Sequence, residues 1–127
     1  MIVVDTSALI AIVLREPQAQ PCIKVLEIET DALASAGTIA EALIVARRRG
    51  VGAEMAELLE GLTIEIVTVT PASAKRVAHA YDRWGKGVHP AGLNFGDCFA
   101  YALAREHSCS LLFVGDDFAK TDIQSAL

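Results

Sequence analysis

The sequence is poor in cysteine and has no long hydrophobic run. Its three cysteines, Cys22, Cys98 and Cys109, are widely spaced, which leaves no disulfide framework and no Cys-x-x-Cys zinc or redox motif. The apolar stretch from Met1 to Leu14 is interrupted by an aspartate, is too short to span a bilayer and is unlike a signal peptide. We therefore expect a protein of the reducing cytoplasm.

Basic residues are also scarce. Lys and Arg total 11 against 16 Asp and Glu, so the formal net charge is −5. This balance argues against a general DNA coat or a polybasic binder of membrane surfaces. Aromatic residues make up only 6% of the chain, yet hydrophobic residues make up 53%, which excludes a disordered protein. A chain of 127 residues can bury a core of its own, and we expect a single domain over residues 1–127.

Short apolar runs alternate with amphipathic segments along the chain. The runs predict strands at Ile2–Val4, Ala32–Ala34, Ile64–Val69 and Leu111–Val114. Helices are predicted from a cap at Thr6 or Ser7 to Leu14, and over Pro17–Ile28, Thr38–Arg49, Ala53–Leu62, Pro71–Trp84 and Asn94–His107. The tail is expected to be irregular or weakly helical. The alternation predicts an α/β fold with a central parallel sheet and helices on both faces.

Carboxylates follow the predicted strands at positions far apart in the sequence. Ligands of open parallel sheets bind outside the carboxyl ends of the strands, and the acids that map there are Asp5, Glu41, Asp97, Asp116 and Asp117. Mutual repulsion makes such a cluster costly unless a cation or protons resolve it. Oxygen ligands without His or Cys suit a hard ion, so the pattern predicts Mg²⁺, with Mn²⁺ as a substitute.

Each acid also has a purely structural interpretation. The residues from Thr38 to Glu41 have the form of a capping box, in which Glu41 bonds back to the helix start, and Asn94 and Asp97 have the same spacing. The two acids after the last strand would serve equally well as turn residues. Asp5 is harder to explain in this way, because it lies between an apolar strand and an apolar helix, where an unpaired charge is costly.

Other motifs carry less weight. Gly85-Lys86-Gly87 lacks the upstream Gly and the following Ser or Thr of a P-loop. Ser7 and Asn94 are expected to support the acidic site, Ser7 by capping a helix and by hydrogen bonding to a carboxylate of the site. We expect four aromatic residues to lie in the core or at a dimer interface: Tyr81, Trp84, Phe95 and Phe99.

The opening motif Asp5-Thr6-Ser7-Ala8-Leu9 resembles that of PIN-domain proteins and, among these, that of the VapC toxins of bacterial type II toxin–antitoxin systems. The resemblance covers the whole chain and is carried further by Glu41 in its short helix, by Gly85–Phe99 and by Leu111–Phe118. It implies a PIN-like three-layer α/β/α fold and a Mg²⁺-dependent endoribonuclease toxin. It also implies a homodimer and inhibition by a VapB-like antitoxin.

Matched by position, the resemblance makes Asp5 and Asp97 the principal metal-binding aspartates. It makes Glu41 the acid that completes the ligand set or holds a water. The family pattern Gly-x-Asp-Phe selects Asp117 as the fourth acid, while the slightly different placement in other PIN domains keeps Asp116 a candidate.

The chemistry expected of this site is cleavage of RNA phosphodiester bonds by water that the metal activates. No His is placed as a general base and no Ser–His pair is present. Two alternatives stay open. One is a non-catalytic PIN-like module that only docks a partner or RNA. The other is an Asp-based phosphohydrolase, although Ser7 stands where such enzymes need a second aspartate. The helices Pro17–Ile28 and Ala53–Leu62 are expected to form core faces, or grooves for the antitoxin or a second copy.

Overall fold

All four strands of the protein run parallel in a single sheet. The computed structural model describes residues 1–127, and its strands lie in the order β3 (Ile64–Val67), β2 (Ala32–Ser35), β1 (Ile2–Val4) and β4 (Ser110–Leu112). The chain moves outward from β1 to β3 and then returns to the other side of β1 for β4. The strand order therefore reverses between β1 and β4, the place where open sheets of this kind bind ligands. The predicted α/β fold with a central parallel sheet is confirmed.

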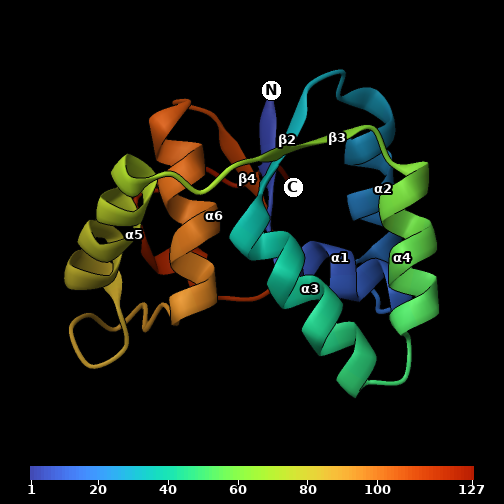
Figure 1. Cartoon of the computed structure of the whole chain (residues 1–127), viewed down its shortest axis with the longest axis horizontal. Coiled ribbons are helices and arrows are strands. Elements are labelled where there is room, and N and C mark those ends of the chain that lie inside the picture. The colour runs from blue at the N-terminus through green and yellow to red at the C-terminus, as the bar shows by residue number, and fades with distance from the viewer.

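Helices cover both faces of the sheet (Figure 1). They are α1 (Thr6–Val13), α2 (Ala19–Ile28), α3 (Ala36–Arg48), α4 (Gly52–Gly61), α5 (Pro71–Trp84) and α6 (Phe95–Glu106), followed by the short 3₁₀ helix η1 (Phe118–Lys120). Helices α5 and α6 lie on one side, α1, α2 and α4 lie on the other, and α3 packs on α1, α4 and α6. None of these helices combines the length and the apolar character needed to cross a membrane.

The core consists of two apolar clusters, one on each face of the sheet. Alternate residues of a strand point to opposite faces. In β1, Val3 therefore packs with α5 and α6, whereas Ile2 and Val4 pack with helices of the other side. Trp84 of α5 belongs to the first cluster and Met55 of α4 to the second. β1 and β2 are buried on both faces, whereas the edge strand β3 is partly exposed and carries Glu65.

Helices α1, α2 and α3 begin at residues other than those expected, α3 at Ala36 and not at Thr38. Helix α1 is capped by Asp5, whose side chain accepts the backbone N–H of Ser7, and not by one of the hydroxyl residues after it. Helix α2 begins at Ala19 and not at Pro17, because Arg15 takes a left-handed conformation (φ 53°) and turns the chain first. The first of these differences places a carboxylate at the junction of β1 and α1.

Strands β3 and β4 end earlier than the sequence predicts. Strand β3 ends at Val67 because its neighbour β2 ends at Ser35, and the register pairs these two residues. After Leu112 the chain leaves the ladder. The backbone N–H of Val114 donates instead to the hydroxyl of Ser7 at 3.0 Å. This bond ties the ends of β1 and β4 together where the strand order reverses.

Candidate active site

Asp5 ends β1 and is buried at the carboxyl edge of the sheet, with 2% of its surface exposed. Its Oδ2 accepts two hydrogen bonds from Ser7, one from the backbone N–H at 3.0 Å and one from the hydroxyl at 2.6 Å. Its Oδ1 is buried without any hydrogen-bond partner. One carboxylate oxygen therefore caps a helix while the other is held out of water with its acceptor capacity unused.

The surroundings of Asp5 disfavour its charged form. The pKa of Asp5 is raised to about 7, mainly by burial and also by the nearby charges of Asp97 and Glu41, while the two Ser7 hydrogen bonds act in the opposite direction. A group buried in this way either takes up a proton or meets a cation. The charged form of Asp5, the acid that is hardest to explain by a structural role, is therefore destabilised by its surroundings.

Asp97 lies in the first turn of α6, across from Asp5. Its Oδ2 accepts the backbone N–H of Asn94 at 3.0 Å, and its own N–H donates to Oδ1 of Asn94 at 2.8 Å, so the two residues form a reciprocal capping box. The pKa of Asp97 is raised to about 6, mainly by burial and also by the charges of Glu41 and Asp117, while the hydrogen bond from Asn94 acts in the opposite direction. The cap fixes the orientation of Asp97 toward the other acids.

Glu41 does not form the capping box that the sequence suggested. Helix α3 begins at Ala36 with Ser35 as its N-cap, so Glu41 lies in the second turn. The Glu41 carboxylate instead lies against the backbone of Gly96, occupying the space that a Cβ at that position would need. A glycine that sequence analysis did not single out therefore admits Glu41 to the site.

The two acids after β4 differ in their relation to the site. Asp117 precedes η1, and its charge is among those that raise the pKa of Asp97. Asp116 is not among the charges that act on Asp97 or on Asp5. Both residues are exposed on the turn after β4, and the charge of Asp117 is the one that reaches Asp97.

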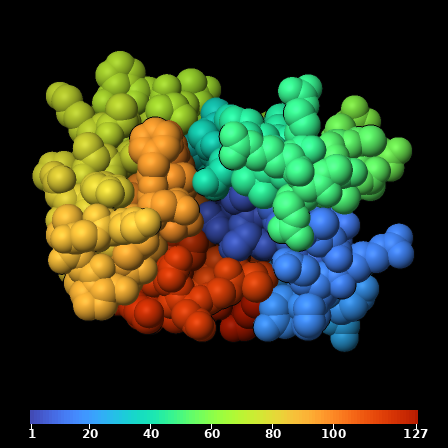
Figure 2. All heavy atoms as spheres, turned by 90° about the horizontal axis from the view of Figure 1, so that it is seen from below, coloured from blue at the N-terminus to red at the C-terminus, as the bar shows by residue number.

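Seen from below, the molecule has a hollow at this edge of the sheet (Figure 2). Its floor is formed by N-terminal atoms, drawn in dark blue, and its walls by the teal and green atoms around α3, the orange atoms of α6 and the red atoms of the C-terminal segment. The segments that form this hollow are those that carry Asp5, Glu41, Asp97 and Asp117.

The donor set fits a hard divalent cation. Asp5, Asp97 and Glu41 offer only carboxylate oxygens, and the unpartnered Oδ1 of Asp5 is a buried acceptor that needs a positive partner. As the side chains stand, no group of three or more His, Cys, Asp or Glu residues is arranged as a complete ion-binding set. The fit therefore rests on the chemistry of these residues and on the orphaned oxygen.

The aromatic residues divide between the core and the surface. Trp84 is buried, as expected. Phe95 was expected in the core or at an interface and is not in the core, because 71% of its surface is exposed at the start of α6. Its ring packs edge-to-face on Phe99 at 5.0 Å. Phe99 in turn lies on the backbone of Gly37, another close approach that sequence analysis did not single out.

Comparison with known sequences finds one family over nearly the whole chain. The model of the PIN domain matches residues 2–124. Ribonuclease VapC30 of Mycobacterium tuberculosis is 40% identical over 124 residues, which cover 95% of each chain. Ribonuclease VapC of Mycolicibacterium smegmatis is 39% identical over 124 residues, covering 95% of this chain and 96% of its own.

Solved structures share the fold at lower identity. The crystal structure of Mycobacterium tuberculosis VapC20, described as a sarcin-ricin loop cleaving toxin, superposes with a TM-score of 0.78 at 16% identity and covers 97% of this chain and 96% of its own. A toxin–antitoxin complex from Klebsiella pneumoniae gives a TM-score of 0.72 at 19% identity, covering 96% of this chain and 93% of the other. At these identities the likeness concerns the fold.

Proposed function

This chain belongs to the PIN-domain family and, within it, to the VapC ribonucleases, and we propose that it is a Mg²⁺-dependent endoribonuclease that acts as the toxin of a toxin–antitoxin pair. Mn²⁺ is the expected substitute for Mg²⁺, since both are hard ions that prefer oxygen ligands. The named relatives support RNA as the substrate, and the acidic hollow at the carboxyl edge of the sheet supports a metal.

One observation carries the metal dependence, namely the buried Oδ1 of Asp5 without a hydrogen-bond partner. A carboxylate that served only as a helix cap would gain nothing from being buried with one oxygen unsatisfied and with Asp97 and Glu41 beside it. A divalent cation satisfies that oxygen and offsets the repulsion among the three acids. The same residues are those that the resemblance assigns to the metal.

Asp5, Asp97 and Glu41 would hold the ion. When bound, Mg²⁺ supplies positive charge that stabilises the charge developing on a phosphodiester and lowers the pKa of water. Ser7 and Asn94 keep one oxygen each of the two aspartates occupied, so that these carboxylates are presented in fixed orientations. Asp117 adds a fourth negative charge beside Asp97.

The decisive experiment replaces the two aspartates by their amides. Asp5→Asn and Asp97→Asn keep the size of the side chain and remove its charge, so the purified variants should fold, bind no Mn²⁺ in calorimetry and cleave RNA at least about a hundredfold more slowly. Asp82→Asn, an exposed acid on α5, is the control and should cleave normally. Unchanged cleavage in either folded site variant would refute the metal assignment.

We further propose that the chain forms a homodimer and is inhibited by a VapB-like antitoxin. Helices α1, α2 and α4 border an apolar cavity of about 620 Å³, with Ile12, Ile23, Leu26, Leu58 and Leu62 among its lining residues. Helices α2 and α4 correspond to the segments expected to form core faces or grooves for the antitoxin or a second copy. The cavity suits the apolar side chains of an antitoxin segment, as in helix-in-groove recognition.

Inhibition by the product of the adjacent reading frame tests this partner. Leu26→Asp places a charge in the cavity, so the variant should still cleave RNA but escape inhibition. Val88→Asp changes an exposed apolar residue outside the cavity and should remain inhibited. Equal inhibition of both variants would exclude this groove, and light scattering of the purified chain would establish whether it is a dimer.

A further inference from the structure

Like charges face each other at the site, and the fold has to hold them together. The charge of Asp117 acts on Asp97, and Asp97 acts on Asp5. Without an ion, the like charges of Asp117 and Asp97 disfavour the close approach of the Asp117 loop to α6. A contact that ties the loop to α6 keeps the fourth acid in place.

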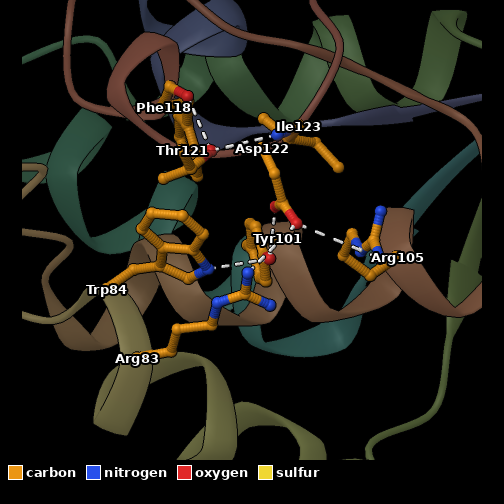
Figure 3. Close-up of polar contacts among 8 residues, drawn as sticks. All are labelled: Arg83, Trp84, Tyr101, Arg105, Phe118, Thr121, Asp122 and Ile123. Carbon is orange, nitrogen blue, oxygen red and sulfur yellow. Dashed lines mark hydrogen bonds and ion pairs between the residues drawn. The ribbon is translucent and has the colours of Figure 1, made fainter.

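A hydrogen-bond chain on α6, buried between Trp84 and Tyr101 and partly exposed at Asp122, makes such a tie (Figure 3). The hydroxyl of Tyr101 donates to Oδ1 of Asp122 at 2.6 Å and accepts the indole N–H of Trp84 at 2.8 Å. Oδ2 of Asp122 faces Arg83 at 3.8 Å and Arg105 at 4.0 Å, which offsets its charge. We call Trp84, Tyr101 and Asp122 the Tyr101 clamp. The Tyr101 hydroxyl has both a donor and an acceptor partner, so its hydrogen bonds are satisfied within the clamp.

The clamp and the site share the same two segments. Tyr101 follows Asp97 by one turn of α6, so both side chains lie on one face of the helix. Asp122 follows Asp117 by five residues in the C-terminal segment. Repulsion between Asp97 and Asp117 therefore opposes the contact between α6 and the C-terminal segment. One turn further along α6, the Tyr101 clamp stabilises that contact.

The segment between Asp117 and Asp122 is compact enough to transmit this pull. The backbone N–H of Thr121 donates to the carbonyl oxygen of Phe118 at 3.0 Å, and the hydroxyl of Thr121 donates to the same oxygen at 2.6 Å. The hydroxyl also accepts the N–H of Ile123 at 3.2 Å. With the Phe118 ring buried in the core, the loop is attached at two points, and Asp122 sets its orientation.

The other end of the clamp reaches the segment that caps α6. Trp84 ends α5, and the glycine-rich loop after it returns so that the N–H of Leu93 donates to the carbonyl oxygen of Trp84 at 3.0 Å. The Trp84 ring also meets His89 of this loop edge-to-face, with 4.7 Å between ring centroids. Asn94, which caps α6 and binds Asp97, follows directly.

We propose that Tyr101 is a positioning residue of the active site, whose hydroxyl holds the Asp117 loop and the α6 cap in the arrangement that receives a divalent cation. The inference rests on the proposed function. Tyr101 would contact neither the ion nor the RNA and would act through its hydrogen bonds with Asp122 and Trp84. Its removal should therefore weaken metal binding in a protein that remains folded.

Binding of Mn²⁺ to the full chain, followed by electron paramagnetic resonance well below the unfolding temperature, tests this role. In Tyr101→Phe and Asp122→Ala we expect the Kd for Mn²⁺ to rise about tenfold, the usual effect of losing a contact that orients metal ligands. Asp122→Asn keeps an acceptor for the Tyr101 hydroxyl and should recover most of the affinity. The emission of Trp84, the single tryptophan, should shift in Tyr101→Phe because the indole N–H loses its acceptor.

The matched control is Arg76→Gln, which removes the 3.1 Å ion pair with Glu106 between the same two helices without touching the C-terminal segment. It should bind Mn²⁺ like the unaltered protein. If Tyr101→Phe and Asp122→Ala also bind Mn²⁺ unchanged, the positioning role is wrong and the proposed function stands. If Tyr101→Phe fails to fold, the comparison of Asp122→Ala with Asp122→Asn decides. If the unaltered protein binds no Mn²⁺, the metal site is wrong and this inference falls with it.

Discussion

At the scale of single residues, each of the two central aspartates uses one oxygen to cap a helix and has the other for the proposed metal. Asp5 caps α1 through Oδ2, and Asp97 closes the capping box of α6 through its own Oδ2. The same side chains that begin the helices are therefore fixed in orientation by the helices. This double use explains why a structural interpretation and a functional one both fitted the sequence, and why neither excludes the other.

The two neighbouring acids after β4 provide a test at this scale. Asp117→Asn should slow RNA cleavage about tenfold or more, because its charge lies beside Asp97 and a neighbour of that kind tunes the metal ligands. Asp116→Asn changes an exposed acid that does not act on Asp97 and should alter the rate by less than about threefold. Initial rates on one RNA substrate decide between them. A larger loss in the Asp116 variant would reverse the assignment.

At the scale of elements, the site depends on how closely α3 approaches α6. Glu41 of α3 reaches the acids only because Gly96 of α6 has no side chain. No pattern within either helix encodes this approach, since the two residues lie far apart in the sequence and meet through packing. Gly96 leaves the space for Glu41, but nothing in its own helix identifies Glu41 as the partner.

Gly96→Ala should therefore separate activity from stability. The new Cβ would displace the Glu41 carboxylate, and a displaced catalytic group can cost about a hundredfold in rate. Stability should change little, because a flexible side chain can move and Ala favours the helix. Gly61→Ala is the matched control, since that helical position is open, and it should raise the Tm without loss of activity. Equal activity of the two variants would contradict this placement of Glu41.

At the scale of the whole molecule, the acidic site accounts for the charge of the protein. Setting aside Asp5, Glu41, Asp97, Asp116 and Asp117 leaves acidic and basic residues equal in number, so the net charge of −5 belongs numerically to the site. The negative total therefore does not argue against an RNA substrate. It predicts instead that RNA binding weakens sharply when the divalent metal is removed.

The metal-free protein should lose stability as the pH rises. The pKa of Asp5 is raised from 3.8, its value in an unfolded chain, to about 7 in the folded protein. At any pH between these two values the folded chain therefore binds more protons than the unfolded chain. The contribution of Asp5 protonation to the free energy of unfolding is complete below about pH 4 and is lost as the pH rises through about 7. In EDTA the Tm should therefore be lower at pH 8 than at pH 5 by about 10 °C, and Mg²⁺ should restore it at pH 8.

Asp5→Asn isolates this effect, because its side chain cannot titrate. Thermal unfolding of the variant in EDTA should depend less on pH between 5 and 8, and its Tm at pH 8 should exceed that of the unaltered metal-free protein. Added Mg²⁺ should stabilise the variant much less. An unaltered protein whose Tm in EDTA is flat or rises over this range would contradict the electrostatic account of Asp5.

Much of this arrangement could be predicted from local patterns. The apolar runs and the helix-capping residues predict the four strands and the six α-helices to within a few residues. The acids that follow the strands are predicted as one group. The errors concern residues whose partners lie elsewhere in the chain. Ser35, not Thr38, caps the start of α3. Phe95 was expected in the core or at an interface; it is exposed at the start of α6 and not in the core, and its place at an interface stays a prediction.

The sequence by itself determined the α/β order of elements, the acids that a parallel sheet must gather at one edge, and the family. These properties are local, because periodicity, caps and motifs depend on residues near one another in the chain. Only the tertiary structure decided that Asp117 stands by Asp97, that Glu41 lies on Gly96, and that Tyr101 joins Asp122 to Trp84. Those contacts depend on the distances between packed elements, which the close packing of the whole core sets and no single segment encodes.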